Sequence, residues 1–224
     1  MQPIPSRLKQ GTEFYGGDLK SHKNYMRMLA ILTGALAVSG TIADVTGDPV
    51  KAAPIVAKTC ALCHGSDGNS QEPKYPKLAG QGAGYIHKQL QDFKSKKRQS
   101  EIMDPIVAQL SADDIANLAV YFASKESAPG VVREKGLLEN GKNLFDDGNP
   151  ASGVPACSGC HGRSGEGSGL YPRLASQHTE YTINELKLFA TSKRTNDRKL
   201  MQTVAERLTE QEIKAVAEYI QSLR

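Results

Sequence analysis

Apolar residues recur at helical spacing in four stretches of the chain, and these stretches form two matching pairs. Residues 85–93 and 181–189 each carry Tyr, Leu and Phe at equivalent positions. Residues 111–122 and 209–220 each begin with Ser or Thr and have an acid three residues later, the pattern of a capping box that opens a helix. No alternation of strand type persists, so the pattern predicts an all-α protein. The apolar stripes of the last two stretches are Ile115, Leu118, Ala119 and Phe122, and Ile213, Val216, Ala217 and Ile220.

The four stretches belong to an internal repeat. The motif Tyr-Pro-x-Leu-Ala-x-Gln occurs at residues 75–81 and again at residues 171–177, and further matches follow at nearly constant spacing. Between the two copies, Ser-Ala-Pro-Gly at residues 127–130 breaks the helical pattern. We therefore expect two tandem domains, residues 44–128 and residues 129–224.

Each copy also contains Cys-x-x-Cys-His, which is the attachment motif of a c-type haem. The two thiols bond to the vinyl groups of one haem and the adjacent imidazole reaches its iron. The helical pattern of the repeat implies a first helix in each copy that carries this motif near its end. A zinc site or a redox dithiol is the alternative, but neither explains why His directly follows both pairs. All the cysteines of the chain lie in these motifs, which leaves none for a disulfide. The residues concerned are Cys60, Cys63 and His64, and Cys157, Cys160 and His161.

The second axial ligand decides whether each iron can bind substrates. Met103 and Met201 lie 43 and 44 residues beyond the first cysteine of their motifs, each just ahead of the last capped helix. A lone Met is commonly core filler, but the matching placement predicts that both are iron ligands. His87 and His178 do not occupy equivalent positions, and we expect them at the surface. A His/Met pair raises the reduction potential relative to two histidines.

Three further pairs of residues are candidates for the surroundings of the haems. An axial His needs its other ring nitrogen held by an acceptor, for which the backbone carbonyls of two prolines are expected. Two leucines would pack on the porphyrin, and two arginines would pair with the propionates. The alternatives are prolines that only stiffen a loop and arginines that lie on a solvated surface. The three pairs are Pro76 and Pro172, Leu78 and Leu174, and Arg98 and Arg194.

Residues 1–43 are expected to form an N-terminal extension that directs export. Residues 28–43 are apolar, follow several basic residues and end in small residues where a signal peptidase would cut before Asp44. The apolar run is shorter than the ~20 residues of a comfortable membrane-spanning helix, which favours cleavage over a retained membrane anchor. Residues 1–25 are polar and are either an over-extended start or a cytoplasmic tail.

Charge argues against nucleic-acid binding. The whole chain carries a net charge of +4, but residues 44–224 carry only +1, and haem propionates would make them negative. The densest positive cluster, residues 94–98, is expected to be a solvated helix end, the alternative being a docking patch for an acidic redox partner.

Over about residues 50–224, these duplicated motifs resemble the dihaem cytochrome c4 family of bacteria, built from two class I cytochrome c domains. The resemblance implies two domains related by a pseudo-twofold axis, covalent haem on the four cysteines, His64 and His161 as proximal ligands, and Met103 and Met201 as distal ligands. It also implies a periplasmic protein, soluble or attached to the inner membrane. Its members pass electrons from a cytochrome bc complex or a small copper protein to a haem-copper terminal oxidase.

The chain departs from the family pattern in two places. Members often carry paired methionines at the distal position, whereas Ile102 and Leu200 precede a single Met here. The long polar stretch ahead of the export segment is also not part of the pattern.

The residues together predict a dihaem electron carrier that transforms no substrate, with two unequal potentials. Two rival functions remain at this stage. One is a fixed dihaem subunit of a respiratory or dehydrogenase complex, attached through residues 28–43. The other is a dihaem peroxidase, which would need an open iron position that this chain, with a matched Met for both irons, does not offer.

Overall fold

The computed structural model describes residues 45–224 and confirms the all-α prediction. The export segment at residues 28–43 lies outside the described residues. Within them, extended pairing is confined to two isolated β-bridges. None of the helices from residue 45 onward is long and apolar enough to cross a membrane.

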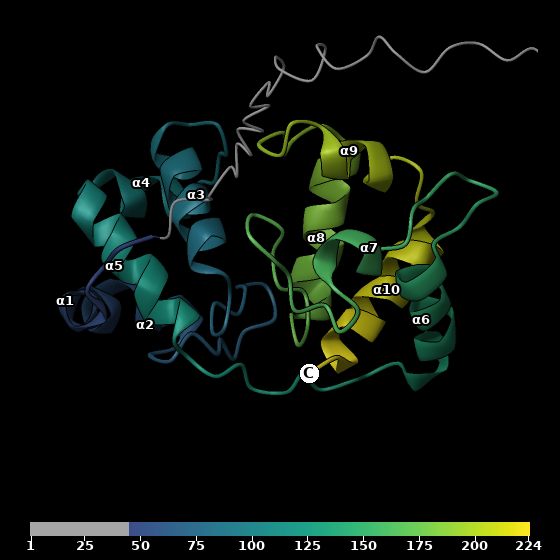
Figure 1. The fold of residues 1–224 in the computed structure, drawn as a ribbon, viewed down its shortest axis with the longest axis horizontal. Coiled ribbons are helices and arrows are strands. Elements are labelled where there is room, and N and C mark those ends of the chain that lie inside the picture. Colours follow the sequence, from purple (N-terminus) through teal and green to yellow (C-terminus); the bar gives the residue numbers. More distant parts are fainter. Residues whose placement is uncertain (1–44) are drawn as a thin grey trace, which may run out of the picture. The chain divides into compact units, whose positions relative to one another are not determined.

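Each copy of the repeat contributes its own set of helices (Figure 1). The first half, up to Ala123, ends in α5, and the second half begins at the short 3-10 helix η2 after an irregular connection. The elements of the first half are α1 (Pro49–Ile55), the π-helical turn η1 (Val56–Cys60), α2 (Ala61–His64), α3 (Ala83–Lys94), α4 (Met103–Ala108) and α5 (Ala112–Ala123). Those of the second half are η2 (Lys135–Leu137), α6 (Leu138–Asp147), α7 (Ser158–His161), α8 (Thr179–Ala190), α9 (Leu200–Ala205) and α10 (Glu210–Ser222).

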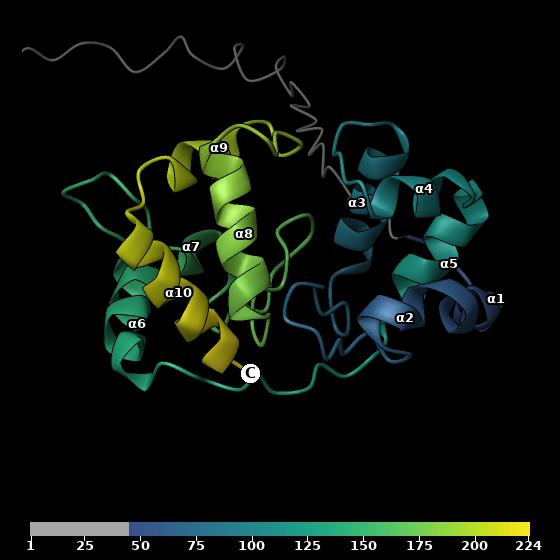
Figure 2. The ribbon, with the colours of Figure 1, turned by 180° about the vertical axis from the view of Figure 1, so that it is seen from behind.

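The two halves pack by the same plan, each around its own apolar core. In the first half α5 packs against α1 and α3, and α4 packs against α3. In the second half α10 packs against α6 and α8, and α9 packs against α8. Figure 2 shows α10 lying across α6. Every residue of the two predicted apolar stripes of α5 and α10 is buried, as expected for a helix that packs with one face on a core.

Both predicted capping boxes are present. The Ser111 hydroxyl accepts from the backbone N–H of Asp114, and the Asp114 carboxylate accepts from the N–H of Ser111. Thr209 and Glu212 make the same pair of bonds at the start of α10. These bonds satisfy N–H groups that a helix end otherwise leaves without partners, so they fix where the last helix of each half begins.

The expectation that one helix carries each cysteine motif near its end is wrong for the second half. In the first half α1, η1 and α2 follow one another without a break. In the second half α6 ends at Asp147, and residues 148–156 form a loop before α7. Gly148 causes the break, because it has a φ of 74° and a Cβ on it would lie 2.3 Å from the Val154 carbonyl oxygen. The bridge between Asn149 and Val154 closes the loop.

Two short helices were not predicted from the sequence. α4 and α9 begin at Met103 and one residue before Met201, and six residues are too few for a clear helical pattern. The loop ahead of α9 is longer than its counterpart, and the structure accommodates the extra length with left-handed backbone at Arg198 and Lys199.

The crossing of α6 and α10 depends on Gly141. A Cβ at this position would lie 2.1 Å from the Ala215 carbonyl oxygen and 2.7 Å from the Cβ of Tyr219. We predict that Gly141→Ala lowers the free energy of unfolding by about 2–3 kcal/mol, because the helices must separate even though Ala is the better helix former. Urea unfolding of the haem-loaded protein measures this change.

Gly136→Ala is the matched control for this prediction. Outside its own turn of the chain, no described atom lies within 4 Å of a Cβ at Gly136, so the free energy of unfolding should change by less than about 0.5 kcal/mol. Equal effects of the two substitutions would contradict the proposed close packing at Gly141.

Candidate functional site

The two motif histidines are buried and held in the same way. His64 ends α2 and His161 ends α7, and their side chains are 8% and 6% exposed. The Nδ1 atom of His64 lies 2.9 Å from the Pro76 carbonyl oxygen, and that of His161 lies 3.0 Å from its counterpart at Pro172. A carbonyl oxygen can only accept, so Nδ1 must donate and Nε2 keeps its lone pair.

The electrostatic surroundings keep both rings neutral. Burial lowers the pKa of His64 and of His161, and the hydrogen bond to the proline carbonyl offsets only part of that shift. A neutral imidazole with a free Nε2 is the form that binds a metal. The predicted carbonyl contacts of the two prolines are thus present, and the ligand role of the histidines remains a proposal.

The first cysteine of each motif is not an activated thiolate. Burial raises the pKa of the Cys60 thiol to about 11 and that of Cys157 to about 11. A redox dithiol needs a lowered pKa. In the part of the chain that the structure describes, no group of three or more His, Cys, Asp or Glu side chains is arranged to hold a metal ion.

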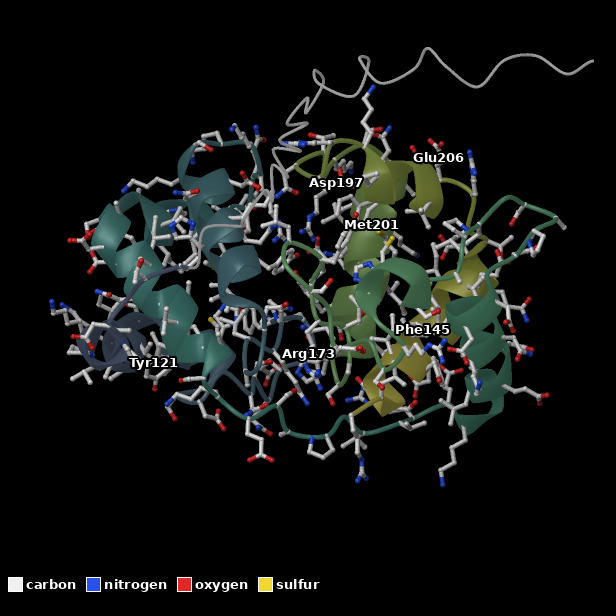
Figure 3. The ribbon with its side chains drawn as sticks, in the orientation of Figure 1. Tyr121, Phe145, Arg173, Asp197, Met201 and Glu206 are labelled. Carbon is white, nitrogen blue, oxygen red and sulfur yellow. The ribbon has the colours of Figure 1, made fainter. Side chains whose placement is uncertain are left out.

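The two methionines occupy matching positions at the start of short helices. Met103 is the first residue of α4, and Met201 is the second residue of α9. The N–H of Met103 donates to the Ser100 hydroxyl at 3.1 Å, and that of Met201 donates to the Asp197 carboxylate. Figure 3 labels Met201 and Asp197 in the same part of the second half. Each Met thus donates its backbone N–H to a side chain of the preceding loop, which fixes the start of the short helix.

In each half, the predicted haem contacts meet at one core. The first cysteine, the leucine and the methionine are partly buried and pack against the apolar core of their own half. A neutral imidazole nitrogen, a thioether sulfur, a thiol and an apolar wall are the groups that a covalently attached haem requires. The residues present fit this cofactor. They are Cys60, Leu78 and Met103 in the first half, and Cys157, Leu174 and Met201 in the second.

The two arginines meet in a polar cluster between the halves. Glu185 of α8 forms ion pairs with Arg98 at 3.1 Å and with Arg194 at 2.5 Å. Arg98 also donates to the Tyr181 hydroxyl at 3.2 Å, and Arg194 to that of Tyr85 at 2.9 Å. The alternative of a solvated surface fails for Arg194, which is 6% exposed. Pairing of these arginines with propionates remains a prediction.

Arg194 stays charged within this cluster. Burial alone would lower the pKa of Arg194, but the neighbouring Glu185 and the hydrogen bond with Tyr85 raise it above its usual value. Burial also raises the pKa of Tyr181, so this hydroxyl remains a neutral hydrogen-bond partner. The carboxylate of Glu185 thus faces two guanidinium groups.

Two glutamines make reciprocal contacts between the halves. The repeat placed them at equivalent positions, but nothing in the sequence indicated their partners. The Gln177 side chain accepts from the Lys77 N–H at 2.9 Å and donates to the Lys77 carbonyl at 3.0 Å. The Gln81 side chain accepts from the Arg173 N–H at 2.8 Å and donates to the Arg173 carbonyl at 2.9 Å. Their placement at the same motif position was the only sequence signal.

The expectation of a surface location is wrong for His178. Its Nε2 atom lies 3.0 Å from both the hydroxyl and the carbonyl oxygen of Ser70, a residue of the other half. His178 follows Gln177 directly, so the contact that holds this glutamine also brings the ring to the other half. Burial lowers the pKa of His178.

The positive cluster at residues 94–98 is divided in the structure. Lys94, the last residue of α3, donates to the Leu110 carbonyl. Lys96 pairs with Asp104 at 2.9 Å, and Arg98 belongs to the Glu185 cluster. Lys94, Lys96 and Lys97 are exposed, as expected for a solvated helix end.

Removing the carboxylate of Glu185 tests the polar cluster. We predict that Glu185→Gln lowers the free energy of unfolding by about 3 kcal/mol, because two buried guanidinium groups lose their shared counter-charge. Thermal or urea unfolding measures the change. The exposed pair of Lys142 and Asp146 is the control, and Asp146→Asn should cost less than about 1 kcal/mol. Similar losses for both variants would contradict the assignment of Glu185 as a buried structural charge.

Comparisons with known proteins agree with this geometry. The cytochrome c family model matches residues 50–125 and 138–224. The chain is 40% identical over 201 residues to a cytochrome c4 of Pseudomonas aeruginosa, covering 88% of this chain and 98% of the relative. It is 36% identical over 171 residues to a thiosulfate dehydrogenase electron acceptor of Stutzerimonas stutzeri, covering 73% and 78%.

A solved structure extends the likeness to the fold. The crystal structure of reduced recombinant cytochrome c4 from Pseudomonas stutzeri has a TM-score of 0.76 and 38% identity, covering 80% of this chain and all of that one. Each half is thus a cytochrome c domain, and the chain carries two covalently bound haem c groups. It is an electron-transfer protein and not an enzyme. The match of both halves to cytochrome c, together with these identities over most of the chain, shows that the chain belongs to the dihaem cytochrome c4 family.

Proposed function

We propose that this protein is a periplasmic carrier of single electrons in which both irons have His and Met as axial ligands. Cys60 and Cys63 would hold the first haem covalently, with His64 and Met103 as its ligands. In the second half the same roles fall to Cys157, Cys160, His161 and Met201. The observation that carries the proposal is the repetition in both halves of a buried imidazole whose Nδ1 is bonded to a carbonyl and a Met held at the start of a short helix.

The chain's own residues account for the chemistry that is needed. A bound haem supplies an iron that changes between the ferrous and ferric states. The imidazole and the thioether are both neutral ligands, and the soft sulfur favours the ferrous form, which raises the potential. The two leucines, which pack against the cores, would help to exclude water from the haems. With a His and a Met to hold each iron, a bound haem would offer oxygen and peroxide no open position, which argues against a peroxidase.

The separate cores support the proposed domain boundaries. We place the first domain at residues 44–128 and the second at residues 129–224. The support is that each core cluster is built from one side of this boundary, and that no α-helix crosses it within the described region. Unequal loops around the two methionines would give the haems different potentials.

The proposed partners are redox proteins. A cytochrome bc complex or a small copper protein would deliver electrons, and a haem-copper terminal oxidase would accept them. Residues 28–43 would direct export to the periplasm and, if retained, would attach the protein to the inner membrane.

A second candidate function is a dedicated electron acceptor or fixed subunit of a dehydrogenase complex. The similarity to a thiosulfate dehydrogenase electron acceptor favours this candidate. It would use the same haem ligands, so the two candidates differ only in the partner and in whether the protein diffuses.

Replacing one distal Met tests the ligand assignment. We predict that Met103→His lowers the potential of the first haem by roughly 0.1–0.2 V, within the ~0.8 V range that axial ligands span, because it removes the thioether that favours ferrous iron. The second haem should change little. Met201→His is the matched variant and should affect the second haem alone. Redox titration followed by visible absorption measures both, and equal shifts of both haems in either variant would contradict two semi-independent sites.

The exported protein itself distinguishes the shuttle from the tethered subunit. We predict that mass spectrometry of the mature protein finds a chain starting at Asp44 with the added mass of two haems, because small residues precede that position. The control is the same protein made without the export machinery, which should carry no covalent haem. An intact N-terminus on the haem-loaded protein would contradict the soluble shuttle and support the tethered form.

A further inference from the structure

Each half sends a glutamine to the peptide group that holds the histidine of the other half. The carbonyl of the peptide between Pro76 and Lys77 accepts from His64 Nδ1 at 2.9 Å. The N–H of that same peptide belongs to Lys77 and donates to the Gln177 side chain at 2.9 Å. A single planar amide therefore joins the first-half histidine to a second-half side chain.

The reverse connection has the same form. The carbonyl of the peptide between Pro172 and Arg173 accepts from His161 Nδ1 at 3.0 Å. Its N–H donates to the Gln81 side chain at 2.8 Å. Figure 3 labels Arg173, whose backbone takes part in this contact. The equivalence of the two connections follows from the repeat, since both glutamines end the same sequence motif.

The two hydrogen bonds of one peptide group reinforce each other. When the N–H donates to a good acceptor, the amide is polarised and its carbonyl oxygen becomes a stronger acceptor. A stronger bond from Nδ1–H leaves more electron density on the imidazole ring and makes Nε2 a better donor to a metal. A better donor stabilises ferric iron, so the connection lowers the potential of the haem whose histidine is involved.

We propose that Gln177 tunes the potential of the first haem and Gln81 that of the second, each acting across the boundary between the halves. Both are positioning residues, since they reach the histidine only through a peptide group. The inference rests on the proposed function, in which His64 and His161 are axial ligands. The docking of the two halves would then influence the potentials of both haems.

Burial makes the effect local. The Gln81 and Gln177 side chains are 7% and 8% exposed, which limits the competition of bulk water for the Lys77 and Arg173 N–H groups. Each glutamine also donates to the carbonyl of the residue whose N–H it accepts, which fixes the plane of its amide. A low local dielectric strengthens such a chain of hydrogen bonds.

Substitution by Met tests the proposal, because Met keeps the length and volume of Gln without its hydrogen bonds. We expect Gln177→Met to raise the potential of the first haem, with a two- to threefold change in the electron-transfer equilibrium constant, about 18–28 mV. The second haem should stay within about a third of that shift. Gln81→Met should give the reverse assignment. The two potentials are read by redox titration of the haem-loaded protein, and Met103→His serves to identify the first haem.

A second measurement follows the hydrogen bond itself. NMR of the reduced protein should show the His64 Nδ1 proton moving to higher field in Gln177→Met, while the His161 proton stays in place. Tyr181→Phe is the control, since it removes a contact between the halves without touching either peptide. It should leave both Nδ1 protons in place.

The outcomes separate the inference from the proposed function. A shift confined to the haem of the same half as the substituted glutamine, or equal shifts of both haems, would overturn the inference and leave the axial ligands untouched. No change in either potential or in either Nδ1 proton would overturn it as well. If instead Met103→His left both potentials unchanged, the ligand assignment itself would fail.

Discussion

The hydrogen bond from each histidine Nδ1 to a proline carbonyl is the interaction on which the rest of the molecule depends. It fixes the orientation and the tautomer of a buried ring, and it leaves the lone pair of Nε2 available. The bond forms because each histidine ends the short helix of its cysteine motif and the loop that carries Tyr-Pro-x-Leu passes beside that histidine. The apolar core and the capped last helix keep these two segments together in each half.

Much of the fold and of the candidate site could be predicted from the sequence, because the relevant signals are local or repeated. The capping boxes at Ser111 and Thr209 depend on residues three positions apart, and the burial of α5 and α10 follows from helical spacing. The duplicated placement of Met103 and Met201 was visible only because the two copies could be laid on each other. Repetition thus supplied information that one domain alone would not contain.

The features that were missed come from contacts between residues far apart in the chain. Gln177 and Lys77 are separated by one hundred positions, and no local pattern indicates such a partner. His178 was expected at the surface because it has no equivalent at the matching position of the repeat, and nothing local indicates its contact with Ser70. Loop 148–156 was missed because one left-handed glycine, Gly148, ends a helix that its counterpart continues. The helical spacing of apolar residues indicates neither contacts between residues far apart in the chain nor the backbone conformation of a single residue.

We propose that imidazole and thioether would close both faces of both haems, so that only electrons enter or leave. The most direct measurement is a redox titration of the purified protein combined with near-infrared spectroscopy of the oxidised form. The account predicts two resolved one-electron steps at positive potential and a weak sulfur-to-iron charge-transfer band from each haem. A high-spin ferric signal at neutral pH, or a charge-transfer band from fewer than two haems, would contradict it.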